Sequence, residues 1–417
     1  MTVRANLLGA LTDALATVLP LTQPADAALR DFFRRHHELG QNDRAFVADG
    51  VFATLRRLRS LGAQAGGATP RGLAIAVTLR ESGASLREIE PALSPDESAW
   101  TKAFKARRPT LSDAEAAELP DWLWEKLGSA MADSDRQALS RSWLVPAPLD
   151  LRVNTAKTTR EKAISALASS GIAATPTTYS PLGLRLATKP ALQLHPLFVD
   201  GAIEVQDEGS QLLGFLMAPK RNDMVVDFCA GAGGKTLLLG ALMRSQGRVY
   251  AFDVSPRRLA KLKPRLARSG LSNVQAILID DERDTKVKRL ARKIDRVLVD
   301  APCSGFGTLR RNPDLKWRQT ASGIPELAAK QTKILAAAAT LVKPGGRLVY
   351  ATCSVLPDEN EAIVDAFLAA HPEFALGDAA AELKRAGIEL DTGRTLKLVT
   401  PIHHCDGFFG AILERSA

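Results

Sequence analysis

The hydrophobic pattern divides the chain into a helical first third and an α/β remainder. Up to about residue 140, apolar residues recur every three or four positions, which predicts one helix after another. The segment 42–62 shows this spacing, with apolar side chains at Phe46, Val47, Val51, Leu55 and Leu58. From about residue 202, short β-branched runs alternate with helical segments. This alternation predicts a mostly parallel, doubly wound α/β sheet with helices on both faces.

The same pattern predicts the individual elements of that sheet. Strands are predicted at 223–229, 247–254, 274–280, 294–300 and 346–353. Helices are predicted between them at 235–245, 256–269, 285–292 and 325–342. Ser255 and Pro256 are favourable as the N-cap and first residue of the second of these helices, whereas Pro264 is expected to kink it.

Two prolines mark the passage from the helical part to the α/β part. Pro146 and Pro148 break helices, and a strand is predicted just beyond them at 151–155. Capping boxes are expected at Ser112–Glu115 and at Thr158–Glu161, each at the start of a helix. We therefore expect a helical domain of residues 1–140, a small α/β connecting domain of residues 141–201 and a larger α/β domain of residues 202–417.

The amino-acid composition indicates the class of binding partner and the cellular compartment. A net charge of +9 and a pI near 9.5 favour a polyanionic partner, with nucleic acid ahead of an acidic membrane. The four cysteines form no C-x-x-C pair, so neither a metal site nor a disulfide framework is predicted, and a reducing cytoplasm is expected. No apolar run is long enough for a transmembrane helix, and residues 1–27, which Asp13 interrupts, favour an amphipathic helix over a signal peptide. We expect a monomer with no membrane partner.

A glycine-rich segment, Cys-Ala-Gly-Ala-Gly-Gly-Lys-Thr at 229–236, joins the first strand of the predicted sheet to its helix. It departs from a phosphate-binding P-loop because Cys229 replaces the first glycine, and its glycines do not fit the nicotinamide fingerprint G-x-G-x-x-G. Asp253, about twenty residues further on, suits ribose hydroxyls. Acids at the ends of later strands, Asp280, Asp281 and Asp300, would repel a triphosphate but suit a cationic centre. Together these features favour S-adenosyl-L-methionine, whose carboxylate suits the loop amides.

Two cysteines follow two consecutive predicted strands. Cys303 lies just beyond strand 294–300 and Cys353 ends strand 346–353, with one helix between them. Strands joined by such a crossover are usually neighbours about 4.8 Å apart, so both thiols are expected beside the methyl donor. One cysteine alone would fit the packing of a small buried hydrophobe, but a pair at matching positions indicates chemistry.

A pair of thiols suits methylation of a pyrimidine at carbon 5. C5 is a poor nucleophile until a thiolate adds at C6 and gives C5 the character of an enamine carbon. C5 can then attack the sulfonium methyl group, after which a base removes the C5 proton and the thiol leaves. Amine methylation of adenine needs no such thiol and typically uses an Asp/Asn-Pro-Pro-aromatic run, where this chain has Asp-Ala-Pro-Cys-Ser at 300–304.

Several motifs resemble those of the Fmu/Sun, RsmB-type (NOP/Sun) family of RNA (cytosine-5)-methyltransferases. They are Arg-Val-Asn-Thr (152–155), Val-Gln-Asp-Glu-Gly-Ser-Gln-Leu (205–212), the loop 229–236, residues 300–317, Tyr-Ala-Thr-Cys-Ser (350–354) and Asp-Gly-Phe-Phe (406–409). The resemblance covers residues 150–417 and implies a class I, Rossmann-like methyltransferase domain that uses S-adenosyl-L-methionine. The segment 43–59 is similar, less specifically, to the NusB-like all-α domain of RsmB-type members.

The resemblance also implies roles for single residues. Cys353 matches the nucleophile that attacks C6, Cys303 the thiol that assists product release, and Asp300 the acid that contacts the cytosine edge. Lys235 matches a position near cofactor and base, and Asp281 is preferred to Asp280 because Arg283 completes a D-x-R pattern. The implied donor-binding set is Cys229, Ala230, Gly231, Ala232, Gly233, Gly234, Lys235, Asp253, Asp281 and Asp300. Ala232 stands where the family usually has proline, a change expected to loosen the loop.

RNA is the expected substrate, and the RsmB-type first domain implies 16S ribosomal RNA. A helix hides the C5 and C6 faces of cytosine, so we expect a single strand or a flipped base. Arg310, Arg311 and Lys316 follow the catalytic loop and are the predicted RNA contacts, while Trp317 either stacks on a base or packs under the loop. Transfer RNA is the alternative substrate. The alternatives of another class are a P-loop-type nucleotide hydrolase or switch and a non-catalytic RNA-binding assembly factor.

Overall fold

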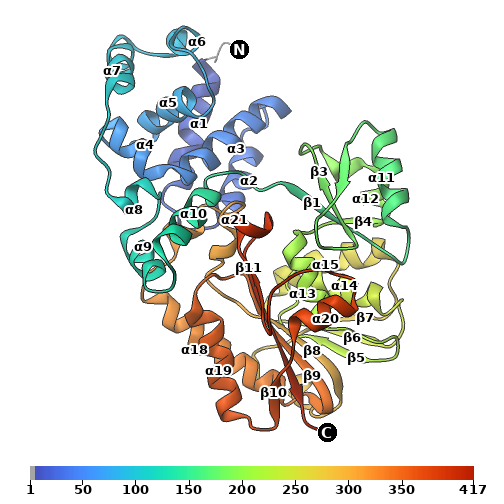
Figure 1. The fold of residues 1–417 in the computed structure, drawn as a ribbon. Helices are drawn as coiled ribbons and strands as arrows, with labels where there is room; N and C mark the ends of the chain where they lie inside the picture. The colour runs from blue at the N-terminus through green and yellow to red at the C-terminus, as the bar shows by residue number, and fades with distance from the viewer. Residues whose placement is uncertain (1–4) are drawn as a thin grey trace. The chain divides into compact units, whose positions relative to one another are not determined.

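The chain folds into two compact units in the computed structural model, which describes residues 5–417 (Figure 1). The helical unit comprises the described residues up to Pro146 together with Leu309–Ala321, and the sheet unit comprises Ala147–Thr308 and Ser322–Ala417. This division differs from the three predicted domains in two ways. The expected connecting domain belongs to the same unit as the large sheet from Ala147 onward, and a short segment from the expected third domain belongs to the helical unit.

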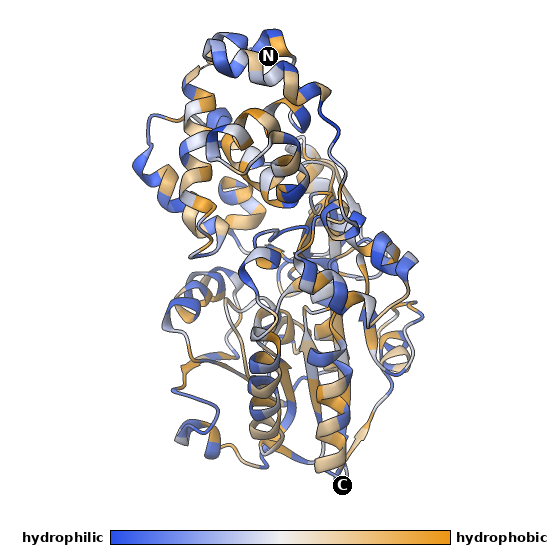
Figure 2. Ribbon diagram, turned by 90° about the vertical axis from the view of Figure 1, so that its left-hand side faces the viewer, coloured by the Kyte–Doolittle hydropathy of each residue, from blue (hydrophilic) through white to orange (hydrophobic). Residues whose placement is uncertain are grey.

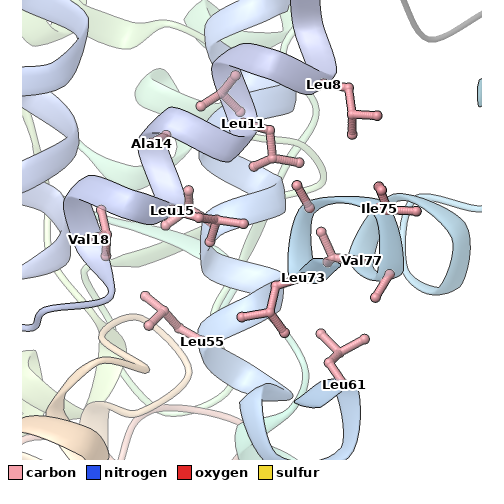
Figure 3. Close-up of a cluster of buried hydrophobic side chains, with 14 of the residues drawn as sticks. Leu8, Leu11, Ala14, Leu15, Val18, Leu55, Leu61, Leu73, Ile75 and Val77 are labelled. Atoms are coloured by element: carbon pink, nitrogen blue, oxygen red, sulfur yellow. The ribbon is translucent and has the colours of Figure 1, made fainter. Parts of the chain in front are cut away.

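Among its described residues the helical unit is all-α, as its hydrophobic spacing predicted. Its α-helices are α1 (Ala5–Val18), α2 (Ala25–Arg35), α3 (Gln41–Arg56), α4 (Leu58–Ala65), α5 (Pro70–Arg80), α6 (Leu86–Ile89), α7 (Pro95–Ala106), α8 (Asp113–Ala116), α9 (Asp121–Gly128), α10 (Asp133–Trp143) and α17 (Leu315–Arg318). α1, α3 and α5 contact one another around buried leucines that include Leu8, Leu11, Leu55 and Leu73 (Figure 3). Figure 2 shows hydrophilic and hydrophobic residues mixed along the helices of this unit. α1 buries residues at helical spacing, whereas α5 is buried throughout Leu73–Leu79.

Two local predictions for this part of the chain are confirmed. The amphipathic helix expected within residues 1–27 is α1, which buries six of its residues, and residues 1–4 lie outside the described part of the chain. The Ser112–Glu115 capping box is present at the start of α8, with both reciprocal hydrogen bonds. None of the helices within residues 5–417 combines the length and the apolar character needed to cross a bilayer.

The segment Leu309–Ala321, which contains α17, supplies a cap to the start of α2. α2 follows Pro24, which has no side chain able to cap the helix. The amide of Ala25 instead donates to Asp314 Oδ2 at 3.2 Å. The first amides of a helix lack partners within it, so a carboxylate placed there also gains from the helix dipole.

The same segment satisfies carbonyl groups at the end of α3. The Leu55 carbonyl accepts a hydrogen bond from Trp317 Nε1 at 2.8 Å, and the Arg56 carbonyl accepts one from Lys316 Nζ at 3.0 Å. In return, the Arg56 guanidinium donates to the Arg310 carbonyl at 3.0 Å. The last carbonyls of a helix have no partner within it, so these bonds explain why the segment folds with α3.

Lys316 lies inside the helical unit, where it is only 2% exposed. Burial lowers the pKa of Lys316 to about 7, although the charge of Glu118 opposes this effect. Burial likewise raises the pKa of Glu118, whose carboxylate accepts hydrogen bonds from the amides of Arg59 and Ser60. The buried position of Lys316 therefore indicates that it stabilises the helical unit, and it does not support the predicted RNA contact.

Lys316→Met is expected to lower the free energy of unfolding by about 2–4 kcal/mol, because it leaves the buried Glu118 carboxylate without an opposing charge. Adding Glu118→Gln removes that uncompensated charge, so the double variant should be less destabilised than the sum of the single variants. Denaturant unfolding of the four proteins measures this coupling. Additive effects would show that the two charges do not act on each other.

A small antiparallel sheet opens the sheet unit. Its strands are β1 (Leu149–Val153), β2 (Ala174–Pro176), β3 (Gly183–Leu186) and β4 (Ile203–Val205), in the order β2-β3-β1-β4. α11 (Arg160–Ser169) and α12 (Pro196–Val199) accompany it. The expected cap at Thr158 is wrong by one residue, since Thr159 is the N-cap of α11 and its side chain accepts from the Lys162 amide.

The large sheet has the predicted doubly wound arrangement. Its parallel strands are β5 (Met224–Asp227), β6 (Arg248–Asp253), β7 (Val274–Leu278), β8 (Ile294–Asp300) and β9 (Val342–Thr352). β10 (Phe374–Leu376), β11 (Leu396–Leu398) and β12 (Phe408–Arg415) extend it in antiparallel fashion, giving the order β10-β12-β9-β8-β5-β6-β7 with β11 beside β12. The strand order reverses at β5, and such a reversal opens a crevice at the carboxyl ends of the strands.

Helices lie between and beside these strands. They are α13 (Glu208–Leu216), α14 (Gly234–Leu242), α15 (Pro256–Ser269), α16 (Thr285–Lys288), α18 (Gly323–Ala339), α19 (Glu361–Ala370), α20 (Ala379–Arg385) and α21 (Thr400–His403). The predicted start of α15 is confirmed, because Ser255 caps the Arg258 amide and Pro256 is the first helical residue. Pro264 lies inside α15, as expected. α16 ends at Lys288, four residues before the predicted end at 292.

Candidate active site

The glycine-rich loop between β5 and α14 lies at the point where the strand order reverses. Gly231 and Gly233 have φ angles of +56° and +83°, in the left-handed region that favours glycine. A Cβ on Gly233 would lie 2.1 Å from Leu262 Cδ1 of α15, so the loop also needs glycine for close packing. Nothing lies within 4 Å of a Cβ built on Gly231, which leaves that side of the loop open to a ligand.

Two arginines from other elements hold the loop in place. Arg152 of β1 donates to the Gly234 carbonyl at 2.6 Å and to Gln206 Oε1 at 2.7 Å. Arg265 of α15 donates to the Ala232 carbonyl at 2.7 Å and is paired with Glu204. The small sheet therefore positions the loop, a role that sequence reasoning did not assign to these side chains.

Acids end three adjacent strands beside this loop. Asp253 at the end of β6 accepts from the Gly231 amide at 2.8 Å through Oδ2 and from the Ser255 amide at 2.7 Å through Oδ1. Asp227 at the end of β5 accepts from the Thr236 hydroxyl at 2.7 Å, and burial raises the pKa of Asp227 to about 7. The third acid, Asp300, ends β8. The Asp253 carboxylate thus stabilises the loop conformation, and its contact with ribose stays a prediction.

A cleft of about 830 Å³ brings most of the predicted residues together. Its lining includes Cys229, Ala230, Gly231, Ala232, Gly234, Lys235, Asp253, Asp281, Asp300, Cys303 and Cys353. Gly233 does not line the cleft, and its role is in the fold of the loop. Asp280 and Asp281 both line it, so the preference for Asp281 stays a prediction. Sequence reasoning missed Gln206, Ser210, Arg258 and Lys330, which come from four separate elements or loops and also line the cleft.

The cleft fits S-adenosylmethionine in size and in chemistry. Its volume lies in the range of about 300–1,000 Å³ that is usual for small-molecule sites. The open side of Gly231 gives a ligand access to the backbone at the start of α14, where amides favour a carboxylate. Asp253 and Asp281 supply negative charge for hydroxyl groups and for a cationic centre.

The two thiols meet at the carboxyl ends of β8 and β9. These strands are parallel neighbours, with Asp300 opposite Ala351, and Cys303 Sγ lies 3.4 Å from Cys353 Sγ. The predicted convergence of the thiols beside the cleft is confirmed. Both cysteines are free and partly accessible, which leaves them available as reagents.

The two sulfurs have different charged neighbours. Lys235 Nζ lies 2.7 Å from Asp300 Oδ2, and although burial acts against its charge, Asp300 and Cys353 raise the pKa of Lys235 above its ordinary value. The pKa of Cys303 is raised well above its ordinary value by its hydrogen bond with Cys353, by burial and by the charge of Glu359. Lys235 therefore supplies a positive charge near Cys353, whereas the raised pKa of Cys303 favours its neutral thiol form.

Two glycines bring the backbone around Cys353 into close contact with the loop that follows Cys303. The Gly307 amide donates to the Cys353 carbonyl at 2.9 Å, and the Gly407 amide donates to the Gly307 carbonyl at 2.8 Å. A Cβ on Gly307 would lie 2.0 Å from the Gly407 carbonyl oxygen, a backbone atom that no side-chain rotation can move away. The Asp-Gly-Phe-Phe motif thus fixes the thiol-bearing loops through backbone contact.

Gly307→Ala is expected to lower the free energy of unfolding by about 1–3 kcal/mol and to reduce methyl transfer, because the added carbon must displace backbone beside Cys353. Gly9→Ala is the matched control, since nothing lies within 4 Å of its added Cβ, and in the middle of α1 it should stabilise by about 0.5–1 kcal/mol. Thermal unfolding and initial rates measure both effects. A Gly307→Ala protein as stable and as active as the wild type would contradict this packing argument.

The predicted RNA contacts do not line this cleft. Arg310, Arg311 and Lys316 all belong to the segment that folds with the helical unit. Arg310 and Lys316 are buried, and Arg311 is half-buried. Trp317 packs against the core of the helical unit and donates to the Leu55 carbonyl, a placement that differs from the expected packing under the catalytic loop.

Comparison with known proteins gives consistent matches. Residues 214–414 match the family model described as 16S rRNA methyltransferase RsmB/F, and residues 119–193 match that of the RsmF/B-like ferredoxin-like domain. The chain is 37% identical over 307 residues to the probable ribosomal RNA small subunit methyltransferase B of Synechocystis sp., covering 73% of this chain and 69% of that protein. It is 37% identical over 288 residues to the ribosomal RNA small subunit methyltransferase B of Sodalis glossinidius, covering 67% and 66%. The matched stretch spans about two thirds of the length of these relatives.

Solved structures agree with the fold. The crystal structure of a protein named PH0851 has a TM-score of 0.83 and 26% identity, and the match covers 100% of both chains. A methyltransferase homolog protein from Pyrococcus horikoshii has a TM-score of 0.58 and 26% identity, covering 71% of this chain and 100% of that one. NSun6 from Pyrococcus horikoshii with SFG, at 22% identity and a TM-score of 0.64, shares the fold over 72% of this chain and 98% of that one.

Proposed function

Because the chain belongs to the RsmB/F family of 16S rRNA methyltransferases, we propose that it methylates carbon 5 of a cytosine in RNA of the small ribosomal subunit. S-adenosylmethionine, when bound, supplies the electrophilic methyl group. The residues that would hold it are the loop 229–235 together with Asp253 and Asp281. The observation that carries the proposal is the pair of sulfur atoms 3.4 Å apart at one end of this cleft.

Cys353 acts as the nucleophile in this proposal. Its thiolate adds to C6 of the cytosine, so that a carbon–sulfur bond forms and the C5–C6 double bond becomes an electron pair available at C5. The positive charge of Lys235, held by Asp300, compensates negative charge as it develops on the ring. In this proposal Asp300 also contacts the edge of the base.

Cys303 acts in the second half of the reaction. Once C5 carries the methyl group, loss of the C5 proton to a base and breakage of the C6–sulfur bond restore the aromatic ring. The neutral thiol of Cys303, next to the departing sulfur of Cys353, assists this elimination. Without it, the covalent adduct has no efficient way to break down.

The product identifies the reaction. Incubation with small-subunit RNA and methyl-tritiated S-adenosylmethionine, followed by digestion to nucleosides, is expected to give labelled 5-methylcytidine. Transfer RNA and the 16S RNA assembled in a particle are tested in parallel. Label in transfer RNA alone would select the alternative substrate. Label in a nucleoside other than 5-methylcytidine, or nucleotide hydrolysis without methyl transfer, would reject the proposed chemistry.

A further inference from the structure

A buried carboxylate, Glu359, bridges the two thiol-bearing loops. Each cysteine is followed by a buried serine, and Ser304 Oγ lies 3.2 Å from Ser354 Oγ. Both hydroxyls donate to the same oxygen, Glu359 Oε2, each at 2.5 Å. Because a serine sits immediately after each thiol, one carboxylate oxygen fixes the separation of two loops that lie about fifty residues apart in the sequence.

The other carboxylate oxygen of Glu359 also accepts two hydrogen bonds. Glu359 Oε1 accepts from the Ser304 amide at 2.8 Å and from Gln331 Nε2 at 3.0 Å. Gln331, on α18, also donates to the Pro302 carbonyl at 3.0 Å, one residue before Cys303. The Glu359 side chain therefore accepts four hydrogen bonds and donates none. This pattern suits an ionised carboxylate, whose two oxygens offer about four lone-pair sites.

The peptide backbone next to Glu359 is anchored to β9. The Tyr350 hydroxyl donates to the Glu359 carbonyl at 2.6 Å, and the Thr352 hydroxyl donates to Asn360 Oδ1 at 2.5 Å. Asn360 Nδ2 donates in turn to the Ser354 carbonyl at 3.1 Å. Glu359 is 0% exposed, and its backbone and its neighbour Asn360 are bound to the end of β9 and to the loop that carries Cys353.

No salt bridge to Glu359 occurs within residues 5–417, so its charge is balanced by neutral donors alone. That charge acts on the neighbouring sulfur: together with the Cys353 hydrogen bond and burial, it raises the pKa of Cys303. Burying a charge without a counter-charge costs desolvation free energy, so a carboxylate retained between the two thiol-bearing loops favours a functional explanation.

We propose that Glu359 is a positioning residue for the proposed reaction, which sets the spacing of the two sulfurs through Ser304 and Ser354 and keeps Cys303 in its neutral, proton-bearing form. The proposal rests on the roles assigned above to Cys353 and Cys303. Two properties of the Glu359 side chain contribute: its length, which lets one carboxylate bind both serines, and its negative charge. Glu359→Gln keeps the length and removes the charge, whereas Glu359→Asp keeps the charge but is too short to bind both serines.

The effect of the Glu359 charge on Cys303 is tested by the reactivity of the Cys303 thiol, in an experiment that needs neither RNA nor methyl donor. Each protein is alkylated with iodoacetamide between pH 6 and 10, and the Cys303 peptide is quantified by mass spectrometry. Glu359→Gln is expected to alkylate Cys303 about tenfold faster near pH 8, with the pH profile displaced to lower pH, because the thiolate fraction controls this rate. Glu359→Asp keeps the carboxylate charge, so it should displace the Cys303 profile less than Glu359→Gln does. Glu382→Gln, the same change at a buried glutamate of α20 that pairs with Arg347, is the matched control and should keep the wild-type profile.

The rate of methyl transfer tests whether the Glu359 side chain sets the spacing of the two sulfurs. Glu359→Asp and Ser354→Ala are expected to lower kcat about tenfold or more with little change in KM for the methyl donor, and thermal unfolding identifies any variant that has lost its fold. A Cys303 pH profile that is unchanged in folded Glu359→Gln would overturn the charge role, and an unchanged kcat in folded Glu359→Asp and Ser354→Ala would overturn the spacing role. Because alkylation needs no substrate, the charge result stands even where the methylated nucleoside proves not to be 5-methylcytidine.

Discussion

Cys353→Ala is expected to reduce methyl transfer by roughly 10⁴-fold or more, to the background of the assay. Without the Cys353 sulfur no bond forms at C6, and C5 of cytosine stays too poor a nucleophile to take a methyl group. Cys303 lies 3.4 Å from the position of the lost sulfur, but burial and the charge of Glu359, which both stay in this variant, still raise its pKa, so the neutral Cys303 thiol is not expected to replace the Cys353 thiolate. Initial rates with tritiated donor and small-subunit RNA measure the loss.

The matched control for this substitution is Cys405→Ala. Cys405 is buried and does not line the cleft, so the same chemical change there should leave the rate close to that of the wild type. Binding of the methyl donor to Cys353→Ala, followed by calorimetry, should be retained because the loop 229–235 is intact. Appreciable methyl transfer by the Cys353→Ala protein would reject a nucleophilic role for this thiol.

Cys303→Ala is expected to accumulate a covalent protein–RNA complex. Addition through Cys353 and methylation at C5 need only Cys353 and the Lys235–Asp300 pair, and both stay in place in this variant. Elimination is slowed because the thiol beside the Cys353 sulfur is gone. A band that resists denaturation in SDS, contains labelled RNA and carries the methyl label is the expected observation.

The double variant Cys303→Ala/Cys353→Ala is the control for the trapped complex. It should give no such band, because the bond to C6 can no longer form. Rapid turnover by Cys303→Ala with no adduct would show that Cys303 does not take part in product release. An adduct that persists in the double variant would show that the RNA is attached elsewhere on the protein.

The sequence anticipated the parts of the site that depend on local pattern. Alternating β-branched runs and helical segments specify a parallel sheet, and the strands of such a sheet end at a common edge. Cys303 and Cys353 each follow a strand by no more than a few residues, so their convergence was predictable from the order of the elements alone. The glycine loop was predictable for the same reason, since Gly231 and Gly233 adopt backbone angles that other residues avoid.

Other features were not predictable because they depend on partners far apart in the sequence. The segment 309–321 looked like an RNA-binding continuation of the catalytic loop, yet Asp314, Lys316 and Trp317 are hydrogen-bonded to the ends of α2 and α3. Nothing in its composition distinguishes a basic surface loop from a segment that caps distant helices. Arg152 and Arg265 were overlooked likewise, although the Arg-Val-Asn-Thr motif was noted, because their targets are backbone carbonyls.

By itself, the sequence determined the elements, their order and the chemistry available at the strand ends, because hydrophobic periodicity, glycine conformation and thiol position are local properties. Only the tertiary structure decided that the two Cys-Ser pairs share one buried carboxylate, that Cys353 and Lys235 influence each other electrostatically, and that Glu359 acts on Cys303. The physical reason is that hydrogen bonds and charges act over a few ångströms of space, and the fold alone fixes which residues come that close.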